Sequence, residues 1–329
     1  MGYNKENFKR IRAEYETKAL LAQRAADGRR EEVHQAIPQL HELDQKLSSF
    51  GLRIMKLAME GGNTDEAIAS LREENQRILA ERRRLLEANG YPEDYCKPHY
   101  ECNECNDSGY IGIRMCACMR RRLAEAGMES SGLGGLMKKQ SFDNFSLDFY
   151  RHNREEYARM EQSFHKLKTY AETFAMDAQM PPESILLLGG TGLGKTHLST
   201  AIARTVIERG YDVFYNSAVG MISDFECRRF GNASAMGDAD NTDRYLTCNL
   251  LILDDLGTEV FNQFTQSTIY FVLNSRLNSG RPTVISSNLK AEDLRKHYSD
   301  RITSRLFGEF HLIPFFGIDI RKQIGRAHV

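Results

Sequence analysis

The feature that most constrains this chain is a glycine-rich loop between an apolar run and a helical pattern, ILLLGGTGLGKTHLSTAIA. Residues 185–188 predict a buried strand, and the apolar spacing after residue 196 predicts a helix. The loop has the full G-x-x-x-x-G-K-[ST] pattern, in which glycines let backbone N–H groups curl around phosphate and the following helix directs its positive end at the same anion. We therefore expect an ATP site formed by Gly189, Gly190, Thr191, Gly192, Leu193, Gly194, Lys195 and Thr196.

A second apolar run, NLLILDDLGTE, ends in a pair of aspartates. A buried parallel strand delivers its last side chains to the crevice beside the first strand's loop, where ligands of open α/β sheets bind. Lys195 is expected to contact the β and γ phosphates, and the Thr196 hydroxyl to ligate Mg²⁺. Asp254 then suits the magnesium shell, and Asp255 suits polarising the attacking water. Seen alone, such a pair is more often a turn signal.

Two further polar elements follow. The β-rich run PTVISSN ends at Asn288, whose amide can orient the lytic water and sense the γ-phosphate, although it can also cap the next helix. Arg301 and Arg305 are spaced i and i+4, which places both on one face of a short helix. They can point toward a phosphate held by a neighbouring subunit, or form a solvated basic face.

The elements alternate in the second half of the chain. The apolar runs SILLL, DVFYN, LLILDD and PTVISSN are separated by helical patterns, which predicts an α/β fold with a parallel sheet flanked by helices. Residues 1–91 have helical spacing and predict a hairpin or coiled coil, with Leu43, Leu47, Phe50, Ile54 and Leu57 on one seam. We expect a cysteine-rich module at 92–122, a linker and entry segment at 123–150, and the ATPase domain at 151–329.

The composition limits the partners and the cellular compartment that we expect for this chain. The 44 basic and 45 acidic residues nearly cancel, so any nucleic-acid binding must come from a local patch. No apolar stretch approaches the length of a membrane span, and the first residues lack the apolar core of a signal peptide. We therefore expect a cytoplasmic protein with no membrane partner, in a compartment where disulfides are rare.

Four of the seven cysteines lie close together, and metal binding is the expected reason. Cys102, Cys105, Cys116 and Cys118 form C-x2-C and C-x-C pairs, and the intervening GYIGIR predicts a hairpin that presents both pairs to one ion. Four thiolates suit tetrahedral structural Zn²⁺. An iron–sulfur cluster and unrelated buried thiols remain alternatives, and Cys96 or His99 can replace one ligand.

Together, GGTGLGKTHLSTAIA, LLILDDLGTE, TVISSN, DRITSRL and GIDIR resemble the bacterial AAA+ replicative helicase loaders, the DnaC/DnaI-like family, over roughly residues 140–325. The resemblance implies an AAA+ core that assembles on itself with ATP, binds single-stranded DNA and engages the hexameric replicative DNA helicase. By motif position it implies that Arg305 is the arginine finger, Arg301 its neighbour, and Arg321 a second sensor that contacts the γ-phosphate. The long helical N-terminal part and the polar loop at 231–243 depart from a minimal loader.

Three other functions fit parts of the pattern. An IstB-like transposition ATPase carries nearly the same motifs, and the cysteine module favours the loader over it. A non-hydrolysing adaptor would use nucleotide only to hold a shape that binds partners, and the pair Asp254 and Asp255 argues against it. A metabolic P-loop kinase has no obvious use for Asn288, Arg305 and Arg321, so it ranks last.

Overall fold

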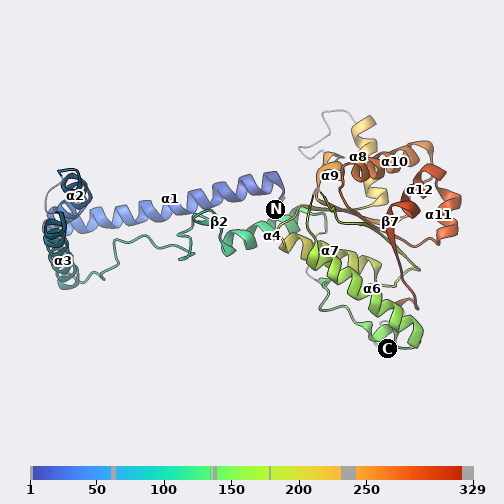
Figure 1. Cartoon of the computed structure of the whole chain (residues 1–329), viewed down its shortest axis with the longest axis horizontal. Coiled ribbons are helices and arrows are strands. Elements are labelled where there is room, and N and C mark those ends of the chain that lie inside the picture. Colours follow the sequence, from blue (N-terminus) through green and yellow to red (C-terminus); the bar gives the residue numbers. More distant parts are fainter. Residues whose placement is uncertain are drawn as a thin grey trace. The chain divides into compact units, whose positions relative to one another are not determined.

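The computed structural model describes residues 3–60, 64–133, 135, 139–177, 179–230 and 242–320. The chain divides into two compact units (Figure 1). The sheet unit combines Met1–Ile11 with Ala117–Val329, and the helical unit is Arg12–Cys116. Residues 231–241 of the polar loop and Arg321 lie outside the described residues.

The helical unit is formed mainly by three helices. They are α1 (Lys5–Ala36), α2 (Pro38–Glu60) and α3 (Thr64–Ala88). Pro38 begins α2, a position where its missing N–H is not needed. Of the expected seam, Leu43, Leu47 and Phe50 pack with Leu71 and Ile78 of α3. Ile54 is 37% exposed, so the apolar contact weakens toward the end of α2.

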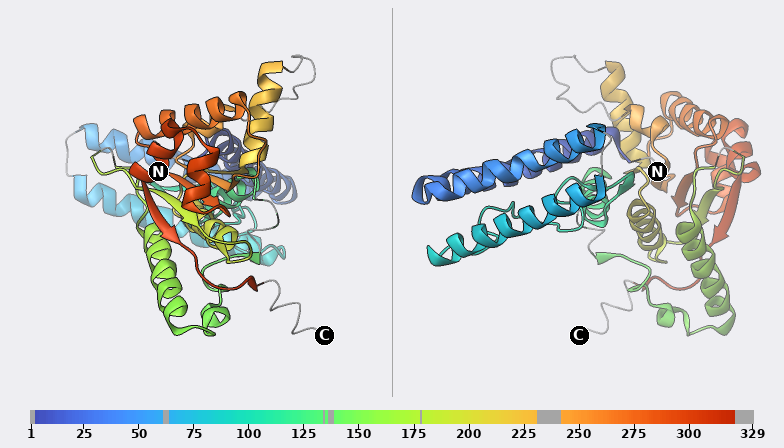
Figure 2. Two further views of the ribbon diagram at one scale, coloured as in Figure 1. Left: turned by 90° about the vertical axis from the view of Figure 1, so that its right-hand side faces the viewer. Right: turned by 60° about the vertical axis from the view of Figure 1, so that its left-hand side comes forward.

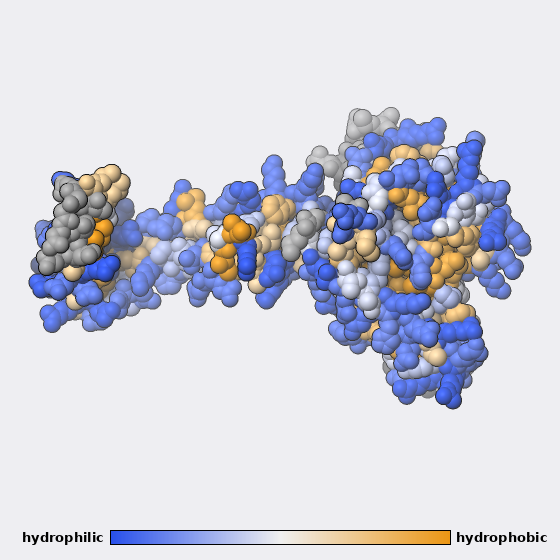
Figure 3. Space-filling model, in the orientation of Figure 1, coloured by the Kyte–Doolittle hydropathy of each residue, from blue (hydrophilic) through white to orange (hydrophobic). Residues whose placement is uncertain are grey.

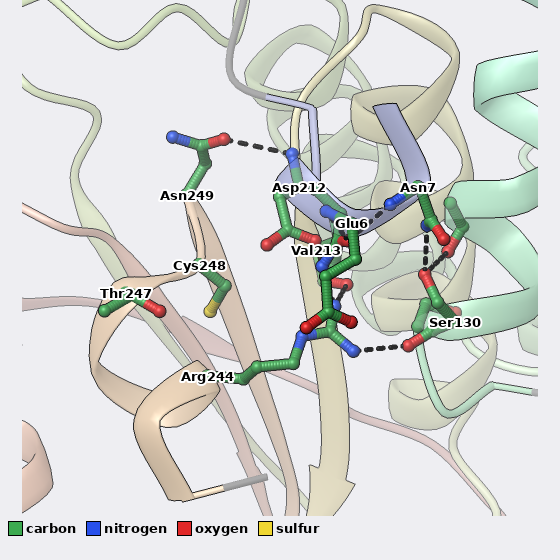
Figure 4. A network of polar contacts seen from close by, with 12 residues as sticks. Glu6, Asn7, Ser130, Asp212, Val213, Arg244, Thr247, Cys248 and Asn249 are labelled. Carbon is green, nitrogen blue, oxygen red and sulfur yellow. Dashed lines mark hydrogen bonds and ion pairs between the residues drawn. The ribbon is translucent and has the colours of Figure 1, made fainter. Parts of the chain in front are cut away.

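The first turns of α1 belong to the sheet unit and are fastened to α4 (Ala117–Ser130). The Asn7 amide donates to the Ala126 carbonyl at 3.0 Å and to the Ser130 hydroxyl at 2.7 Å. Arg244 donates to the Ser130 carbonyl at 2.6 Å and to Asp212 at 2.9 Å (Figure 4). Side chains from three separate segments therefore meet at the end of α4.

The expected hairpin within the cysteine segment is present, with β1 (Tyr110–Ile111) antiparallel to β2 (Arg114–Met115). Part of the segment expected to be a linker, residues 128–133, is instead packed within the sheet unit. Met128 lies within α4, and Ser131 and Leu133 after it are buried. The Ser131 carbonyl accepts from the Tyr215 N–H at 2.8 Å, so this glycine-containing stretch packs beside a strand of the sheet unit.

The sheet unit contains a five-stranded parallel sheet, ordered β4-β5-β6-β3-β7. Its strands are β3 (Ser184–Leu188), β4 (Val213–Ser217), β5 (Leu250–Leu256), β6 (Thr283–Ser287) and β7 (Phe310–Pro314). The first four are the strands that the apolar runs predicted. The edge strand β7 was not expected, because its FHLIP sequence is short and three of its five side chains are exposed.

Helices cover both faces of this sheet (Figures 1 and 2). One face carries α4, α6 (Arg154–Thr173) and α7 (Lys195–Glu208), preceded by the short 3-10 helix η1 (Leu147–Tyr150). The other carries α8 (Ala218–Phe230), α9 (Thr242–Thr247), α10 (Gln263–Asn278), α11 (Ala291–His297) and α12 (Asp300–Gly308). Side chains of β3 alternate between the two cores, with Ile185 and Leu187 in one and Leu186 in the other. The expected class, a parallel sheet flanked by helices, is confirmed.

The surface differs between the regions drawn in Figure 3, where hydrophilic side chains cover most of the long N-terminal helices and apolar residues gather in patches over the sheet unit. Among the described helices, none combines the length and the apolar content needed to cross a membrane.

Candidate nucleotide site and cysteine cluster

The glycine-rich loop lies between the end of β3 and the start of α7, as the sequence predicted. Gly194 is the N-cap of α7 and has a φ of +79°, a conformation that favours glycine. A Cβ atom at this position would lie 2.7 Å from Cε2 of Phe145, so the site has no room for a side chain. A glycine-rich loop that leads into the first turn of a helix is the arrangement that binds phosphate, because the first N–H groups of a helix have no acceptor within the helix.

Lys195 is buried, and its ammonium group is surrounded by oxygen acceptors. It donates to the carbonyls of Gly189 and Gly190 at 2.7 Å each, and to the Asn288 side-chain oxygen at 2.6 Å. The Asn288 amide in turn donates to Asp255 at 2.9 Å. The alternative of a helix cap does not describe this side chain, because the N-cap of α11 is Lys290. Three residues predicted from separate motifs thus form one hydrogen-bonded chain.

Asp254 lies beside Thr196, where a magnesium ligand is expected. Its Oδ2 accepts from the Thr196 hydroxyl at 2.9 Å and from the Tyr215 hydroxyl at 2.6 Å, and its Oδ1 accepts from the Ser286 hydroxyl. Asp254 is only 4% exposed, so these donors balance much of the cost of burying its charge. A hydroxyl and a carboxylate side by side are hard oxygen donors, which fits Mg²⁺.

Consecutive side chains of a regular strand point to opposite faces, yet Asp254 contacts Thr196 and Asp255 contacts Asn288. The reason is local. The register between β5 and β6 shifts between Leu253 and Leu256, and Asp255 has a φ of +54°. Such an irregularity turns the backbone and re-aims the side chain. The Asp255 N–H is held by the Ser286 hydroxyl at 3.0 Å, so the unusual backbone is secured from the neighbouring strand.

A cavity of about 560 Å³ opens over the loop. Besides the loop, Asp255 and Asn288, its lining includes an aromatic wall that the sequence analysis missed, formed by Phe145 and Phe149. His197 joins this wall, with its ring centroid 5.2 Å from that of Phe145. A flat apolar wall beside a phosphate loop suits a nucleotide base. The aromatic spacing in SFDNFSLDFY is the signal that was available.

Two titratable side chains of the site have shifted pKa values. Burial lowers the pKa of His197, and its hydrogen bond to the Ser141 carbonyl, 2.9 Å long, partly offsets this. Burial, and then the charge of Asp254, raise the pKa of Tyr215. Tyr215 therefore remains a hydrogen-bond donor to Asp254 at any physiological pH. Sequence reasoning missed Tyr215 because its contact with Asp254 depends on the β4–β5 register, in which Tyr215 pairs with Ile252 and Ser217 pairs with Asp254.

The predicted arginines lie elsewhere on the sheet unit. Arg301 is exposed near the start of α12, and Arg305 forms an ion pair with Glu309 at 3.3 Å. Among the described residues, neither lines the nucleotide cavity. Their roles toward a neighbouring subunit, and that of Arg321, stay predictions.

The four predicted cysteines come together. Their sulfur atoms all lie within 4.8 Å of one another, and those of Cys102 and Cys116 are 3.8 Å apart. Tetrahedral zinc with Zn–S bonds of about 2.3 Å separates its sulfurs by about 3.8 Å, so the arrangement fits a single ion. Asp107 supports the first pair by accepting from the backbone N–H groups of Glu101 and Cys102 at 2.8 Å each.

The possible substitute ligands have other contacts. Cys96 packs in an apolar cluster with Leu86, and the His99 ring contacts Arg29 at 3.0 Å.

The fold and the loop geometry define a P-loop nucleotide-binding protein of the AAA+ class. Within that class, the chain belongs to the IstB-like ATP binding protein family, whose family model matches residues 153–323. The expected relation to the DnaC/DnaI-like proteins is also confirmed. The chain is similar to the replicative helicase loader DnaC of Escherichia coli strain K12, with 26% identity over 180 residues, 54% of this chain and 66% of that protein.

Two further proteins and one solved structure are also similar to this chain. The phage-like element PBSX protein XkdC of Bacillus subtilis strain 168 is 27% identical over 209 residues, which covers 59% of this chain and 74% of that protein. The chromosomal replication initiator protein DnaA of Zymomonas mobilis is 32% identical over 136 residues, 41% of this chain and 27% of that protein. A crystal structure of the DnaC helicase loader aligns with a TM-score of 0.45 and 17% identity over 55% of this chain and 98% of that one.

Proposed function

We propose that this protein is an ATP-dependent loader that places the hexameric replicative DNA helicase on single-stranded DNA, and that it hydrolyses ATP with Mg²⁺. The observation that carries the hydrolytic part is the hydrogen-bonded chain Lys195–Asn288–Asp255, which joins the start of α7 to the ends of β6 and β5. The similarity to the replicative helicase loader DnaC supports the loading part. Such a loader would work in the cytoplasm with the replication machinery.

In this proposal the loop and Lys195 bind the β and γ phosphates, while Phe145 and Phe149 hold the base. Thr196 and Asp254 would hold Mg²⁺, which neutralises charge on the phosphates. Because Asp254 is already held by hydroxyl donors, its oxygen atoms need little rearrangement to bind the ion.

Asp255 would accept a hydrogen bond from the attacking water and so polarise the water for attack on the γ-phosphate. Asn288 bonds to both Lys195 and Asp255, so it can sense the γ-phosphate and orient the water from one position. Arg305, with Arg301 beside it, would reach the γ-phosphate of a neighbouring copy, and Arg321 the bound γ-phosphate. The site would then be complete only in a self-assembled form.

The four cysteines would bind one structural Zn²⁺. A ten-residue gap between the pairs closes through the β1–β2 hairpin, and the segment has little apolar core of its own. Metal binding would supply much of its folding free energy.

Turnover separates an ATPase from a nucleotide-switched adaptor. We expect phosphate release by the full chain with Mg²⁺, and a loss of about 100-fold in Asp255→Asn with ATP affinity nearly unchanged. The matched control is Asp148→Asn, an exposed aspartate of η1 that lies outside the cavity lining. ATP binding without turnover in the wild type would instead establish the adaptor.

The family model itself favours a second candidate, the IstB-like transposition ATPase. Native mass analysis of the full chain with the replicative helicase of its own host, with and without ATP, distinguishes the two. A complex of defined stoichiometry that responds to ATP supports the loader, and helicase transfer to single-stranded DNA should accompany it. No complex under either condition rejects the loader, and a complex with a transposase would then support the second candidate.

A further inference from the structure

A buried glutamate follows β5, the strand that carries Asp255, and has no part in the site described above. Glu259 is 5% exposed, and its carboxylate accepts from the Gly257 N–H at 2.9 Å and from the Tyr298 hydroxyl. Burying a carboxylate is costly unless it is well hydrogen-bonded, and both of these donors are neutral. A neutral or apolar side chain would avoid this cost, so the contact calls for a reason beyond stability.

One side of Glu259 is tied to the loop that follows Asp255. Gly257 has a φ of +102°, and a Cβ atom there would lie 2.4 Å from Cδ1 of Leu289. The Ser287 hydroxyl donates to the Leu256 carbonyl at 2.6 Å and accepts from the Leu289 N–H. The loop is therefore packed against the end of β6, next to Asn288.

The other side of Glu259 contacts the residues just before α12, the arginine helix, which carries Arg301 and Arg305. Tyr298 is 3% exposed and lies between α11 and α12. Ser299, the N-cap of α12, donates its N–H to Gln266 at 3.2 Å. The Phe261 ring adds a stacked contact with His297 at 4.6 Å and an edge contact with Tyr298 at 5.3 Å.

From this geometry we infer that Glu259 and Tyr298 are positioning residues: their hydrogen bond fixes helix α12, and with it Arg301 and Arg305, relative to the strand end that carries Asp255. The inference rests on the proposed ATPase and deepens it. Asp255 is held separately by Ser286 and Asn288, so loss of the Tyr298 hydroxyl should loosen the start of α12 and leave Asp255 in place. Arg305 is about 10 Å along the helix from Tyr298, so a small rotation at the helix start displaces its guanidinium.

The direct test compares Tyr298→Phe with wild type by hydrogen exchange. The variant keeps the ring contact with Phe261 and removes only the hydroxyl. We expect faster exchange over residues 299–309 and unchanged exchange over the glycine-rich loop. The matched control is Tyr170→Phe, which removes a buried hydroxyl that has no hydrogen-bond partner among the described residues. Equal exchange of α12 in wild type and Tyr298→Phe overturns the inference, whether or not the protein hydrolyses ATP.

Mixed assemblies then locate the defect. Tyr298→Phe alone should turn over about tenfold more slowly at unchanged ATP affinity. Adding Lys195→Ala copies, whose own sites are inactive but whose arginine helices are intact, should restore turnover at the Tyr298→Phe sites. The double variant Lys195→Ala/Tyr298→Phe should not restore it. A defect that intact neighbours cannot rescue would mean that Tyr298 supports only its own site, which overturns the inference. Absence of turnover in wild type would reject the ATPase proposal, and the exchange result would still decide the positioning role.

Discussion

The nucleotide site and the cysteine cluster reach their geometry in opposite ways. The four cysteines lie between residues 102 and 118, and a two-stranded hairpin returns the second pair to the first. Lys195, Asp255 and Asn288 are far apart in the sequence and meet because β3, β6 and β5 are neighbours in the sheet. The cluster is a local arrangement, whereas the nucleotide site depends on the whole core.

This difference has an energetic consequence. Both faces of the sheet are buried under helices, so the strand ends are fixed by two large apolar cores before any ligand binds. The hairpin has exposed apolar residues, including Ile113 at 100% exposure, and little core beneath it. We therefore expect the cluster to need its ligand for folding, and the nucleotide site to need its ligand only for function.

Metal removal should separate the two regions most strongly. With zinc bound, residues 101–116 should resist hydrogen exchange, and a chelator should abolish that protection, since structural zinc supplies about 10–16 kcal/mol in small zinc modules. ATP affinity should change by less than about twofold, because the sheet core remains. Exchange and ATP titration on the same sample measure both effects.

Metal analysis gives the control for this prediction. About one zinc per chain is expected in the wild type and in Cys227→Ser, whose exposed thiol lies outside the cluster, but not in Cys105→Ser. Iron in place of zinc would establish the iron–sulfur alternative. Metal-free protein with unchanged exchange would mean that the thiols hold no ion.

Lys195→Ala should impair the nucleotide site and leave the cysteine cluster unchanged. Removing the buried ammonium should weaken ATP binding about 100-fold, or about 2.7 kcal/mol, because the phosphates lose their main positive partner. Zinc content and exchange in the cysteine segment should not change. Lys166→Ala, an exposed lysine of α6, serves as the charge-matched control in equilibrium ATP titrations. A loss of zinc in Lys195→Ala would contradict the independence of the two regions.

The same contrast explains what the sequence could predict. The glycine-rich loop, the strand before it and the cysteine pairs are contiguous patterns, and each was found. The position of Asp254, Asp255 and Asn288 near the glycine-rich loop could be predicted because parallel strands end at one edge, a rule that needs no register. Tyr215 was missed because its partner depends on the β4–β5 register, and the Glu259–Tyr298 contact because it joins two loops.

Local rules also failed where tertiary packing decided the outcome. Residues after Met128 have linker composition, yet Leu133 is 2% exposed in the core beside α7. The positive φ of Asp255 could not be inferred, since only a small fraction of aspartates adopt it and the sequence does not say which. Edge strand β7 has only a weak alternation of apolar and polar residues and ends at Pro314. It is recognised as a strand from its pairing with β3, which the sequence does not show.

Tyr215→Phe tests the magnesium side of the nucleotide site. Without its hydroxyl, Asp254 loses the donor at 2.6 Å and keeps Thr196 and Ser286. We expect the Mg²⁺ concentration for half-maximal turnover to rise by up to about tenfold, since one hydrogen bond to a charged group is worth about 1.5 kcal/mol. Tyr211→Phe, in the apolar core beside Phe174, is the control. An unchanged magnesium dependence would show that Tyr215 only packs the strand.

The smallest expected effect is a pH dependence at the aromatic wall. Because burial lowers the pKa of His197 in the folded protein, the unfolded chain binds the proton more readily. The neutral ring therefore stabilises the fold above the ordinary histidine pKa of about 6.5, and this contribution is lost as the pH falls below it. The loss should be small, because His197 is only partly buried and solvent screens much of its charge.

His197→Gln isolates the contribution of His197 protonation to stability. The glutamine amide can donate to the Ser141 carbonyl as the imidazole does, but it cannot titrate. Urea unfolding at pH 7.5 and pH 5.5 should show a smaller decrease in the free energy of unfolding for the variant than for wild type. His165→Gln, at an exposed position of α6, should behave like wild type. An equal decrease in wild type and His197→Gln would mean that protonation of His197 does not couple to the fold.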